Sequence, residues 1–326
     1  MKKRIAIVQP ILSPYSIPRF EELAKDETLE IILLIEKSTF SHRPGWNVTD
    51  VKGCTVEIIG SHIRKERIEN TEQGYVIEGI RAIPYRLPML LLKYRPHIIL
   101  VCNATELLFA YLLKHILNYK IGLIVEDTIH AVSNLKPLNR SLKSVLYKKA
   151  DFYLPFSNDA LKYLNNIKIN KPFYRTSWSV DLNHFSKFDN EAIKDIRDSL
   201  RLNDKLVFLA VSRLDAGKGI LNLLRAIKGL PNDFLNNISL LIVGSGPQEN
   251  ELREFIRVND LINVSLLGQK NYDELVTYYH LADIFILPTL KDLFSLTVME
   301  AMACGLPILT TKYNGARELI EEGKNG

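Results

Sequence analysis

The stretch 283–308 constrains the fold of this chain more than any other segment, because a strand, a loop, a helix and a turn follow one another in it. Residues 284–287 are an apolar run closed by a proline, which is typical of a buried parallel strand. From Ser295 the apolar residues recur at helical spacing, and Gly305 ends the helix. A helix that begins just past the carboxyl end of a parallel strand offers free N–H groups and the positive end of its dipole. The stretch therefore predicts a seat for a phosphate or diphosphate, with Glu300 inside the helix as an acceptor for vicinal hydroxyls.

Two cations follow another predicted strand, in the segment 211–219 with the sequence VSRLDAGKG. In open α/β sheets, ligands bind at the carboxyl ends of the strands. Arg213 offers a planar fork of donors for phosphate oxygens, and Lys218 offers a mobile point charge. Taken alone, the segment favours an ordinary salt bridge on a βα loop. With the Glu300 segment downstream, we interpret it as a clamp for a diphosphate leaving group.

Both segments resemble the signature of the retaining glycosyltransferases of family GT4, which have the two-Rossmann GT-B architecture. The segment 300–307, EAMACGLP, matches the family pattern closely. In the family, another glutamate precedes the first residue of this segment with seven residues between them, and here that position is Asp292. The resemblance implies that Glu300 holds the ribose of a sugar nucleotide and that Asp292 lies near the transferred sugar. It also implies that Arg213 and Lys218 neutralise the diphosphate. The alternative for Glu300 is a solvated glutamate on an ordinary βα unit.

Further residues of the second half are expected to bind the donor, the sugar nucleotide. The turn of Gly244 and Gly246 looks like the start of a dinucleotide fingerprint, but Glu249 replaces the third glycine and no acid follows at the ribose-binding spacing. A nicotinamide site is therefore disfavoured. By resemblance, this turn lines the donor cleft and the backbone near Gln269 contacts the nucleobase. The start of the predicted helix would stabilise the leaving group through Phe294, Ser295 and Leu296.

The first half is expected to hold the acceptor. The loop 9–18, QPILSPYSIP, resembles the Tyr-Arg-x-Pro variant of a subset of the family, and its Tyr15 either stacks on a sugar or packs within the loop. Glu126 and Asp127 end a predicted strand where other members often have His-Asp. His130 fits a site residue and a surface loop histidine equally well.

Alternating strands and helices predict an α/β fold with two Rossmann-like, doubly wound parallel sheets facing each other across a cleft. The resemblance places an acceptor domain at 1–180 and a nucleotide-sugar domain at 181–326, with a hinge around 180–200. The chain is expected to lack the C-terminal helices that usually follow in the family. The predicted strands are 4–9, 29–35, 55–59, 97–102, 121–125, 152–155, 205–212, 239–243, 263–267, 284–287 and 307–309. The main predicted helices are 19–25, 86–94, 220–228 and 249–258.

Composition narrows the class of protein. A length of 326 residues, with 47% hydrophobic and 24% charged residues, is typical of a soluble protein of two domains. The three cysteines lack metal-ligand spacing and are expected to be free thiols in a reducing cytoplasm. No apolar run reaches membrane-spanning length. The net charge of +5 favours anionic partners without indicating nucleic acid.

The segment 136–149 is basic and has apolar residues at helical spacing, namely Leu138, Leu142, Val145 and Leu146. We expect an amphipathic helix whose apolar face packs on the core. Its excess of cations also fits an anionic bilayer surface.

The resemblance implies a retaining glycosyltransferase without metal or cofactor, which uses a nucleoside diphosphate sugar as co-substrate. The acceptor would be a hydroxyl of a saccharide or lipid-linked glycan, in bacterial-type polysaccharide or glycolipid biosynthesis. The protein would be cytoplasmic and peripheral at the inner face of the membrane. Two alternatives stay open: a sugar-nucleotide epimerase on the same fold, and a non-catalytic scaffold that keeps the fold.

Overall fold

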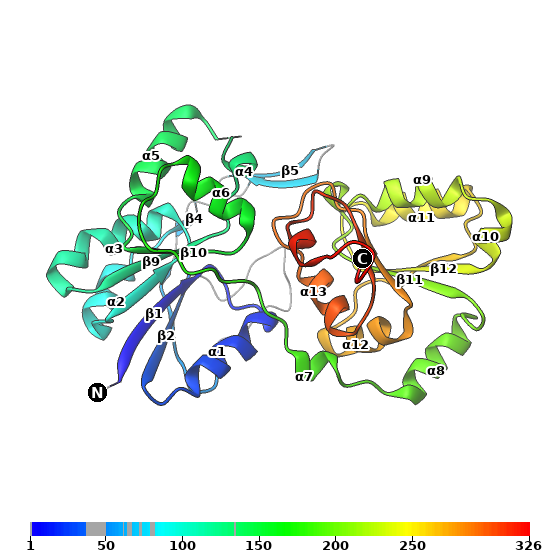
Figure 1. The fold of residues 1–326 in the computed structure, drawn as a ribbon, viewed down its shortest axis with the longest axis horizontal. Helices are drawn as coiled ribbons and strands as arrows, with labels where there is room; N and C mark the ends of the chain where they lie inside the picture. The colour runs from blue at the N-terminus through cyan, green and yellow to red at the C-terminus, as the bar shows by residue number, and fades with distance from the viewer. Residues whose placement is uncertain are drawn as a thin grey trace. The chain divides into compact units, whose positions relative to one another are not determined.

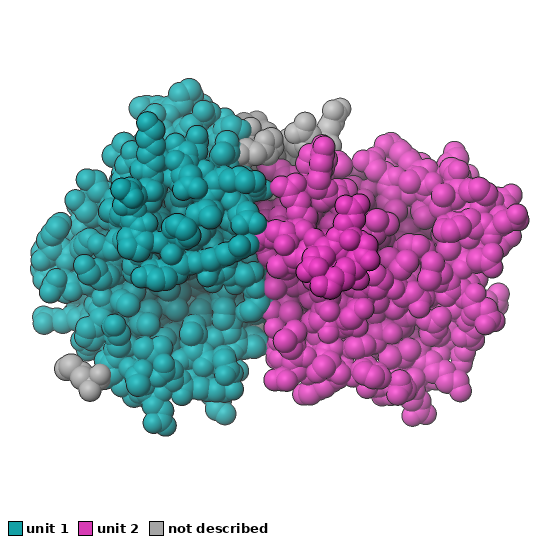
Figure 2. Space-filling model, in the orientation of Figure 1, with its two compact units in different colours: residues 1–67, 78–179 teal, residues 68–77, 180–326 magenta. Residues whose placement is uncertain are grey.

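The computed structural model of the chain describes residues 2–36, 50–60, 62–63, 67–71, 74–78, 82–133 and 135–326 (Figure 1). The chain divides into two compact units, coloured separately in Figure 2. The N-terminal unit comprises 1–67 and 78–179, and the C-terminal unit comprises 68–77 and 180–326. Each unit is built around a parallel sheet of its own.

In the described part of the N-terminal unit, six parallel strands pair in the order β10-β9-β8-β1-β2-β3. They are β1 (Lys3–Gln9), β2 (Leu29–Ile35), β3 (Thr55–Ile58), β8 (Ile98–Val101), β9 (Lys120–Val125) and β10 (Phe152–Pro155). The helices are α1 (Ile17–Ala24), α2 (Leu87–Tyr94), α3 (Ala104–Leu117), α4 (Ile129–Ser133), α5 (Pro137–Tyr147) and α6 (Asn158–Asn166), with the 3₁₀ turn η1 (Pro14–Ser16). Strand β2 is almost wholly apolar because both of its faces are covered, and its last five residues are buried.

Short pairs of strands lie between β3 and α2 in the chain. Strand β4 (His62–Ile63) pairs with β7 (Ala82–Ile83), and β5 (Arg67–Thr71) pairs with β6 (Gly74–Glu78). The sequence pattern did not predict them. These strands are short and lack the long apolar runs that marked the parallel strands.

The described C-terminal unit has five parallel strands in the order β13-β12-β11-β14-β15. They are β11 (Leu206–Val211), β12 (Ile238–Val243), β13 (Val264–Leu266), β14 (Ile284–Leu287) and β15 (Ile308–Thr310). The helices are α7 (Leu182–Phe185), α8 (Asn190–Ser199), α9 (Ile220–Lys228), α10 (Asn232–Asn236), α11 (Glu249–Val258), α12 (Tyr272–Leu281) and α13 (Leu296–Ala303), with the 3₁₀ turns η2 (Ala216–Lys218) and η3 (Gly315–Leu319). The strand order reverses between β11 and β14, which makes their carboxyl ends a topological switch point.

The structure confirms the predicted fold class of two parallel-sheet α/β units. Strands β2, β10 and β14 have the predicted bounds, as do helices α9 and α11. The other predicted strands differ by one residue at one or both ends, which is within the usual uncertainty of element boundaries.

Close backbone contacts join the loops at the carboxyl edge of the C-terminal sheet. Gly244, after β12, has φ +142°, and a Cβ there would lie 1.8 Å from the carbonyl oxygen of Ser212, after β11. Gly219 has φ +70°, and its Cβ would lie 2.2 Å from the carbonyl oxygen of Pro288, after β14. Only glycine allows loops to approach this closely.

We predict that Gly244→Ala destabilises the protein by about 3 kcal/mol or more, because the added methyl group overlaps the Ser212 carbonyl as well as straining the backbone. Gly268→Ala is the matched control. Gly268 also has positive φ, +71°, but a Cβ added there would have no atom within 4 Å. We expect it to cost about 1–2 kcal/mol. Chemical denaturation of both variants measures the difference, and equal losses would contradict the steric argument.

Candidate functional site

Residues predicted to contact the diphosphate or the transferred sugar follow the strands at the switch point of the C-terminal sheet. Arg213 and Lys218 follow β11, and Asp292 follows β14. Strands β11 and β14 are paired neighbours, with Phe208 opposite Ile284. The carboxyl ends of parallel neighbours lie at the same edge, so residues 74 positions apart in the chain come into contact.

Lys218 is ion-paired with Asp292. The Nζ–Oδ2 distance is 2.5 Å, and the two side chains are 23% and 14% exposed. The other carboxylate oxygen, Oδ1, accepts a hydrogen bond from the Phe294 N–H at 3.2 Å. The backbone of Asp292 is fixed as well, since its N–H donates to Tyr313 and its carbonyl accepts from Gly315. Asp292 therefore links Lys218 to the loop that leads into α13.

Arg213 lies on the same loop as Lys218 and is more exposed. Its Nε is 3.7 Å from Oδ2 of Asp215, and the two side chains are 38% and 11% exposed. Two hydrogen bonds to the Gly217 carbonyl, from the Leu290 N–H at 2.8 Å and the Thr289 hydroxyl at 3.0 Å, tie this loop to the end of β14. The backbone beneath both cations is therefore held by the neighbouring strand.

Helix α13 begins where the sequence predicted. Ser295 is its N-cap residue, but in the described part of the chain its side chain does not cap the helix and instead bonds the Thr297 hydroxyl at 3.0 Å. Phe294 and Ser295 are buried and Leu296 is half-buried. The first N–H groups of α13 are thus left without a side-chain cap, as an anion seat requires.

Glu300 lies on α13 and is completely buried. The Tyr279 hydroxyl donates to its Oε2 at 2.6 Å, while among the described residues Oε1 has no hydrogen-bond partner. Burial raises the pKa of Glu300 to about 7, and the Tyr279 hydrogen bond opposes that rise. The sequence predicted a carboxylate with two oxygens available to hydroxyls, whereas one oxygen is already engaged.

Loops after β12 and β13 bring together other residues that were predicted to bind the donor. The Ser245 hydroxyl donates to Oε1 of Gln269 at 3.1 Å, and the Gly244 N–H donates to the Gly268 carbonyl at 2.8 Å. A Cβ at Gly246 would lie 2.5 Å from the Leu214 carbonyl oxygen, so this glycine too allows a close approach. The glycine turn, Gln269 and the cation loop therefore share one edge of the sheet.

The predicted acceptor residues belong to the N-terminal unit. Tyr15 is half-buried in η1, and Glu126 follows β9 with an exposed side chain. Asp127 is engaged by α5: Lys143 pairs with Oδ1 at 2.7 Å, and the Tyr147 hydroxyl donates to Oδ2 at 2.5 Å. His130 is in α4, and its side chain is outside the described part. Asp127 therefore holds α5 in place.

A buried acid pair in the N-terminal unit was not expected from the sequence. Glu36, after β2, is 4% exposed, and Glu106, in the first turn of α3, is fully buried. Burial raises the pKa of Glu106 to about 8, and the charge of Glu36 adds to the rise. Asn103 and Glu106 form a capping box at the start of α3. An asparagine followed three residues later by a glutamate is a sequence signal for such a box, and it could have located Glu106 at the start of a helix. No signal marked Tyr279 as the partner of Glu300.

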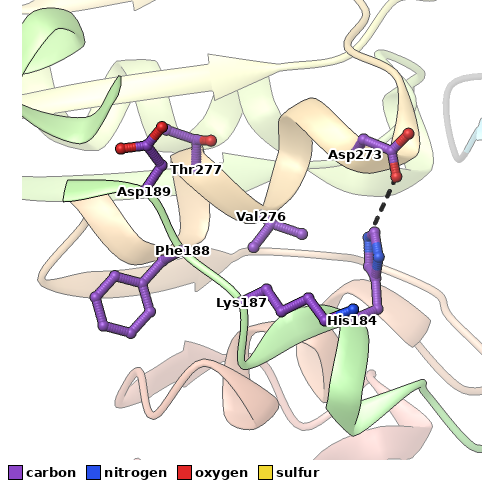
Figure 3. Close-up of a pocket in the computed structure, with 7 residues that line it drawn as sticks. All are labelled: His184, Lys187, Phe188, Asp189, Asp273, Val276 and Thr277. Carbon is purple, nitrogen blue, oxygen red and sulfur yellow. Dashed lines mark ion pairs between the residues drawn. The ribbon is translucent and has the colours of Figure 1, made fainter. Parts of the chain in front are cut away.

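A pocket of about 480 Å³ lies elsewhere on the C-terminal unit (Figure 3). It is lined by His184, Lys187, Phe188, Asp189, Asp273, Val276 and Thr277. Figure 3 marks the ion pair of His184 with Asp273, at 3.8 Å. The His184 ring also stacks on Tyr272, with centroids 4.2 Å apart. None of the predicted site residues lines this pocket.

The described residues do not offer two other kinds of site. They contain no group of three or more His, Cys, Asp or Glu side chains arranged to hold a metal ion. Within the same residues, no helix combines the length and the apolar character that a membrane span requires. Cys54, Cys102 and Cys304 are free thiols.

Comparisons with known proteins point to one family. The family model for glycosyl transferases group 1 matches residues 192–326. The Campylobacter jejuni protein named N-acetylgalactosamine-N,N'-diacetylbacillosaminyl-diphospho-undecaprenol 4-alpha-N-acetylgalactosaminyltransferase is 30% identical over 74% of this chain and 67% of its own length. An uncharacterized glycosyltransferase of Methanocaldococcus jannaschii is 26% identical over 58% of this chain. The chain spans only 29–47% of the length of several curated relatives.

Similarity to solved structures extends over the whole chain. The crystal structure of Anabaena HepE in complex with UDP superposes with a TM-score of 0.75 and 16% identity, covering 100% of this chain and 85% of HepE. At this identity the likeness shows the fold. The two parallel-sheet units therefore have the GT-B architecture.

We predict that Glu300→Gln changes how stability depends on pH. The folded pKa of about 7 lies above the ordinary value of 4.5, so the native state binds the extra proton and the wild type loses stability as pH rises through this interval. The glutamine does not titrate. Relative to the wild type, the variant should gain up to about 3 kcal/mol between pH 5 and pH 8.

Urea denaturation at pH 5, 6, 7 and 8 measures this difference. Glu322→Gln, at an exposed position in the same unit, is the control and should follow the wild type. If the free energy of unfolding of Glu300→Gln differs from that of the wild type by the same amount at all four pH values, the predicted rise in the pKa of Glu300 would be wrong.

Proposed function

We propose a function from one premise: this chain belongs to the glycosyl transferases group 1 family. The proposed reaction moves a sugar from a nucleoside diphosphate sugar to a hydroxyl of a saccharide or lipid-linked glycan, with retention at the anomeric carbon. One observation carries the proposal. Lys218 is ion-paired with Asp292, and Asp292 accepts a hydrogen bond from the Phe294 N–H in the loop that leads into α13. These contacts lie at the switch point, where β11 and β14 are neighbouring strands.

The proposed catalysis is stabilisation of the leaving group. As the bond from sugar to diphosphate breaks, negative charge grows on the diphosphate. Arg213, Lys218 and the N–H groups at the start of α13 are donors suited to that charge. These donors sit on backbone that the neighbouring loops hold, so little reorganisation is needed during the reaction. We assign no enzymic nucleophile, and we propose no cofactor beyond the sugar nucleotide as co-substrate.

The proposed donor is a nucleoside diphosphate sugar. Support comes from two structures of Anabaena HepE, one in complex with UDP and one with UDP-glucose. Glu300 would receive the ribose hydroxyls, since its buried Oε1 has no hydrogen-bond partner among the described residues. Asp292 would lie near the transferred sugar. The backbone around Gln269 and the turn of Gly244 would contact the nucleoside.

The proposed acceptor is bound by the N-terminal unit, and bacterial-type polysaccharide or glycolipid synthesis is the proposed context. The names of relatives support a lipid-linked saccharide, since one acts on a diphospho-undecaprenol glycan and another is a lipopolysaccharide 1,2-N-acetylglucosaminetransferase. Tyr15, Glu126 and His130 stay as acceptor-side candidates. Asp127 is a weaker candidate because both of its oxygens are used by α5.

We also propose that the N-terminal unit binds an anionic membrane surface. The expected apolar face of 136–149 does not pack on the core: Leu138, Leu142 and Val145 are 79%, 58% and 56% exposed. Only the side of α5 around Tyr147 is buried, and Leu146 is half-buried. The apolar stripe of α5, formed by Leu138, Leu142 and Val145, is therefore exposed to solvent.

A second exposed stripe supports the same surface. Helix α3 packs against α5, and its Leu108, Leu112 and Ile116 are 39%, 63% and 72% exposed. Exposed cations border the stripes, namely Lys136, Lys148 and Lys149. Neighbouring apolar stripes with a basic border are typical of helices that lie in the interface of an anionic bilayer.

We predict that Arg213→Ala and Lys218→Ala each slow sugar transfer by roughly 10- to 100-fold, because each removes a charged hydrogen bond to the leaving group worth about 1.5–3 kcal/mol. Both variants should fold. Lys228→Ala, an exposed cation at the end of α9, is the control and should keep full activity. Transfer is followed with radiolabelled sugar nucleotides and membrane extracts as acceptor.

Unchanged kinetics in both variants would remove these residues from the site. Product analysis in the same assay distinguishes transfer from epimerisation of the sugar nucleotide. If the wild type shows no transfer and no donor hydrolysis with any member of a panel of nucleotide sugars, that result would favour a non-catalytic scaffold.

We predict salt-sensitive binding to vesicles that contain phosphatidylglycerol. Reversing two bordering charges, Lys136→Glu with Lys148→Glu, should weaken binding by tenfold or more, since each cation near an anionic surface contributes about 1 kcal/mol. Replacing two apolar residues, Leu138→Ser with Leu142→Ser, should also weaken binding. Lowering the salt concentration should not restore the binding of this variant. Sedimentation with vesicles measures both.

The control for this experiment is Ile262→Ser, which removes an 85% exposed apolar residue from the C-terminal unit. It should bind like the wild type. Lys143 is left unchanged because its ion pair with Asp127 holds α5. Equal partitioning of the wild type to phosphatidylglycerol vesicles and to neutral phosphatidylcholine vesicles would contradict the proposed surface.

A further inference from the structure

A tyrosine from another helix holds the buried carboxylate of α13. Tyr279, on α12, is completely buried, and its hydroxyl donates to Oε2 of Glu300 at 2.6 Å. The Tyr279 ring packs against the rings of Phe185 and Phe285, with centroids 5.8 Å and 5.9 Å away. Because aromatic neighbours on two different elements fix the ring, the hydroxyl is held in one position.

The two oxygens of Glu300 therefore have different roles available to them. Oε2 accepts the Tyr279 hydrogen bond, whereas Oε1 is buried and lacks a partner among the residues that the structure describes. A buried oxygen without a donor is unfavourable, and a bound ligand that supplies a hydroxyl removes this cost. Of the two carboxylate oxygens, Oε1 is therefore the one that can accept a hydrogen bond from a ligand.

We propose that Tyr279 is the positioning residue of the nucleotide site: it fixes Glu300 so that Oε1 faces a ribose hydroxyl of the bound nucleotide. This inference rests on the proposed function, which puts a nucleoside diphosphate at this edge of the sheet. Tyr279 itself does not touch the nucleotide. Its hydroxyl also favours the ionised form of Glu300, which accepts stronger hydrogen bonds than the neutral acid.

The experiment compares nucleotides with and without ribose hydroxyls. Calorimetry first finds which of UDP, GDP and ADP binds the wild-type chain most tightly, and then measures that nucleotide and its 2′,3′-dideoxy analogue. For Tyr279→Phe we expect about a tenfold loss of affinity for the ribonucleotide, equivalent to one hydrogen bond with a charged group. The affinity for the dideoxy analogue should not change.

Two further variants make the result specific. Tyr278→Phe removes the hydroxyl of the adjacent tyrosine, which is also buried, and should leave both affinities unchanged. In a Glu300→Gln background, Tyr279→Phe should cost much less than in the wild type, since the charged partner is gone. This background also tests the proposal if Tyr279→Phe alone proves unstable.

Equal losses for the two nucleotides would overturn the proposal, because Tyr279 would then act on the fold as a whole. Unchanged affinity for the ribonucleotide would overturn it as well. A wild-type chain that binds none of the three nucleoside diphosphates would instead contradict the proposed function, and the inference would fall with it.

Discussion

Backbone hydrogen bonds between loops hold the C-terminal site together. The Leu214 N–H donates to the Ser245 carbonyl, the Gly244 N–H to the Gly268 carbonyl, and the Leu290 N–H to the Gly217 carbonyl. These three bonds join the loops after β11, β12, β13 and β14. Since main-chain groups make them, they do not use the side chains that would contact a ligand. The backbone of the cation loop, the glycine turn and the loop after β14 is therefore held before any ligand arrives, which limits reorganisation at this candidate site to side chains.

The sequence was sufficient for the fold and for the edge of the sheet at which candidate residues gather. Apolar runs closed by glycine or proline predicted strands such as β14 to the residue, because a strand covered on both faces must be apolar throughout. The parallel order then dictated that segments after β11 and β14 meet. Spacing along the chain did not show which carboxylate each cation would contact. The pairing of Lys218 with Asp292, across 74 positions, depends on side-chain geometry that only the folded chain supplies.

Helix α5 shows a second limit of sequence patterns. A period of 3.6 residues predicts that a helix has an apolar side, but it does not say whether that side faces the core or the solvent. In α5 the exposed side carries Leu138 and Leu142, while Tyr147 faces inward and, with Lys143, holds Asp127. A polar interaction fixes the orientation of this helix, and it is provided by Asp127, an acceptor-side candidate that follows β9.

Asp292 determines how an anion could enter the site. Its carboxylate already engages two donors at the edge of the sheet where the proposed diphosphate would bind, the Lys218 ammonium and the Phe294 N–H. An ammonium group has three N–H donors and can keep Asp292 while it binds a phosphate oxygen, but a backbone N–H has one donor. The smallest change that admits a diphosphate is therefore a shift of Asp292 away from Phe294 with its bond to Lys218 retained. Under the function proposed above, a phosphate oxygen would take the place of the aspartate at the Phe294 N–H, while Asp292 keeps its bond to Lys218.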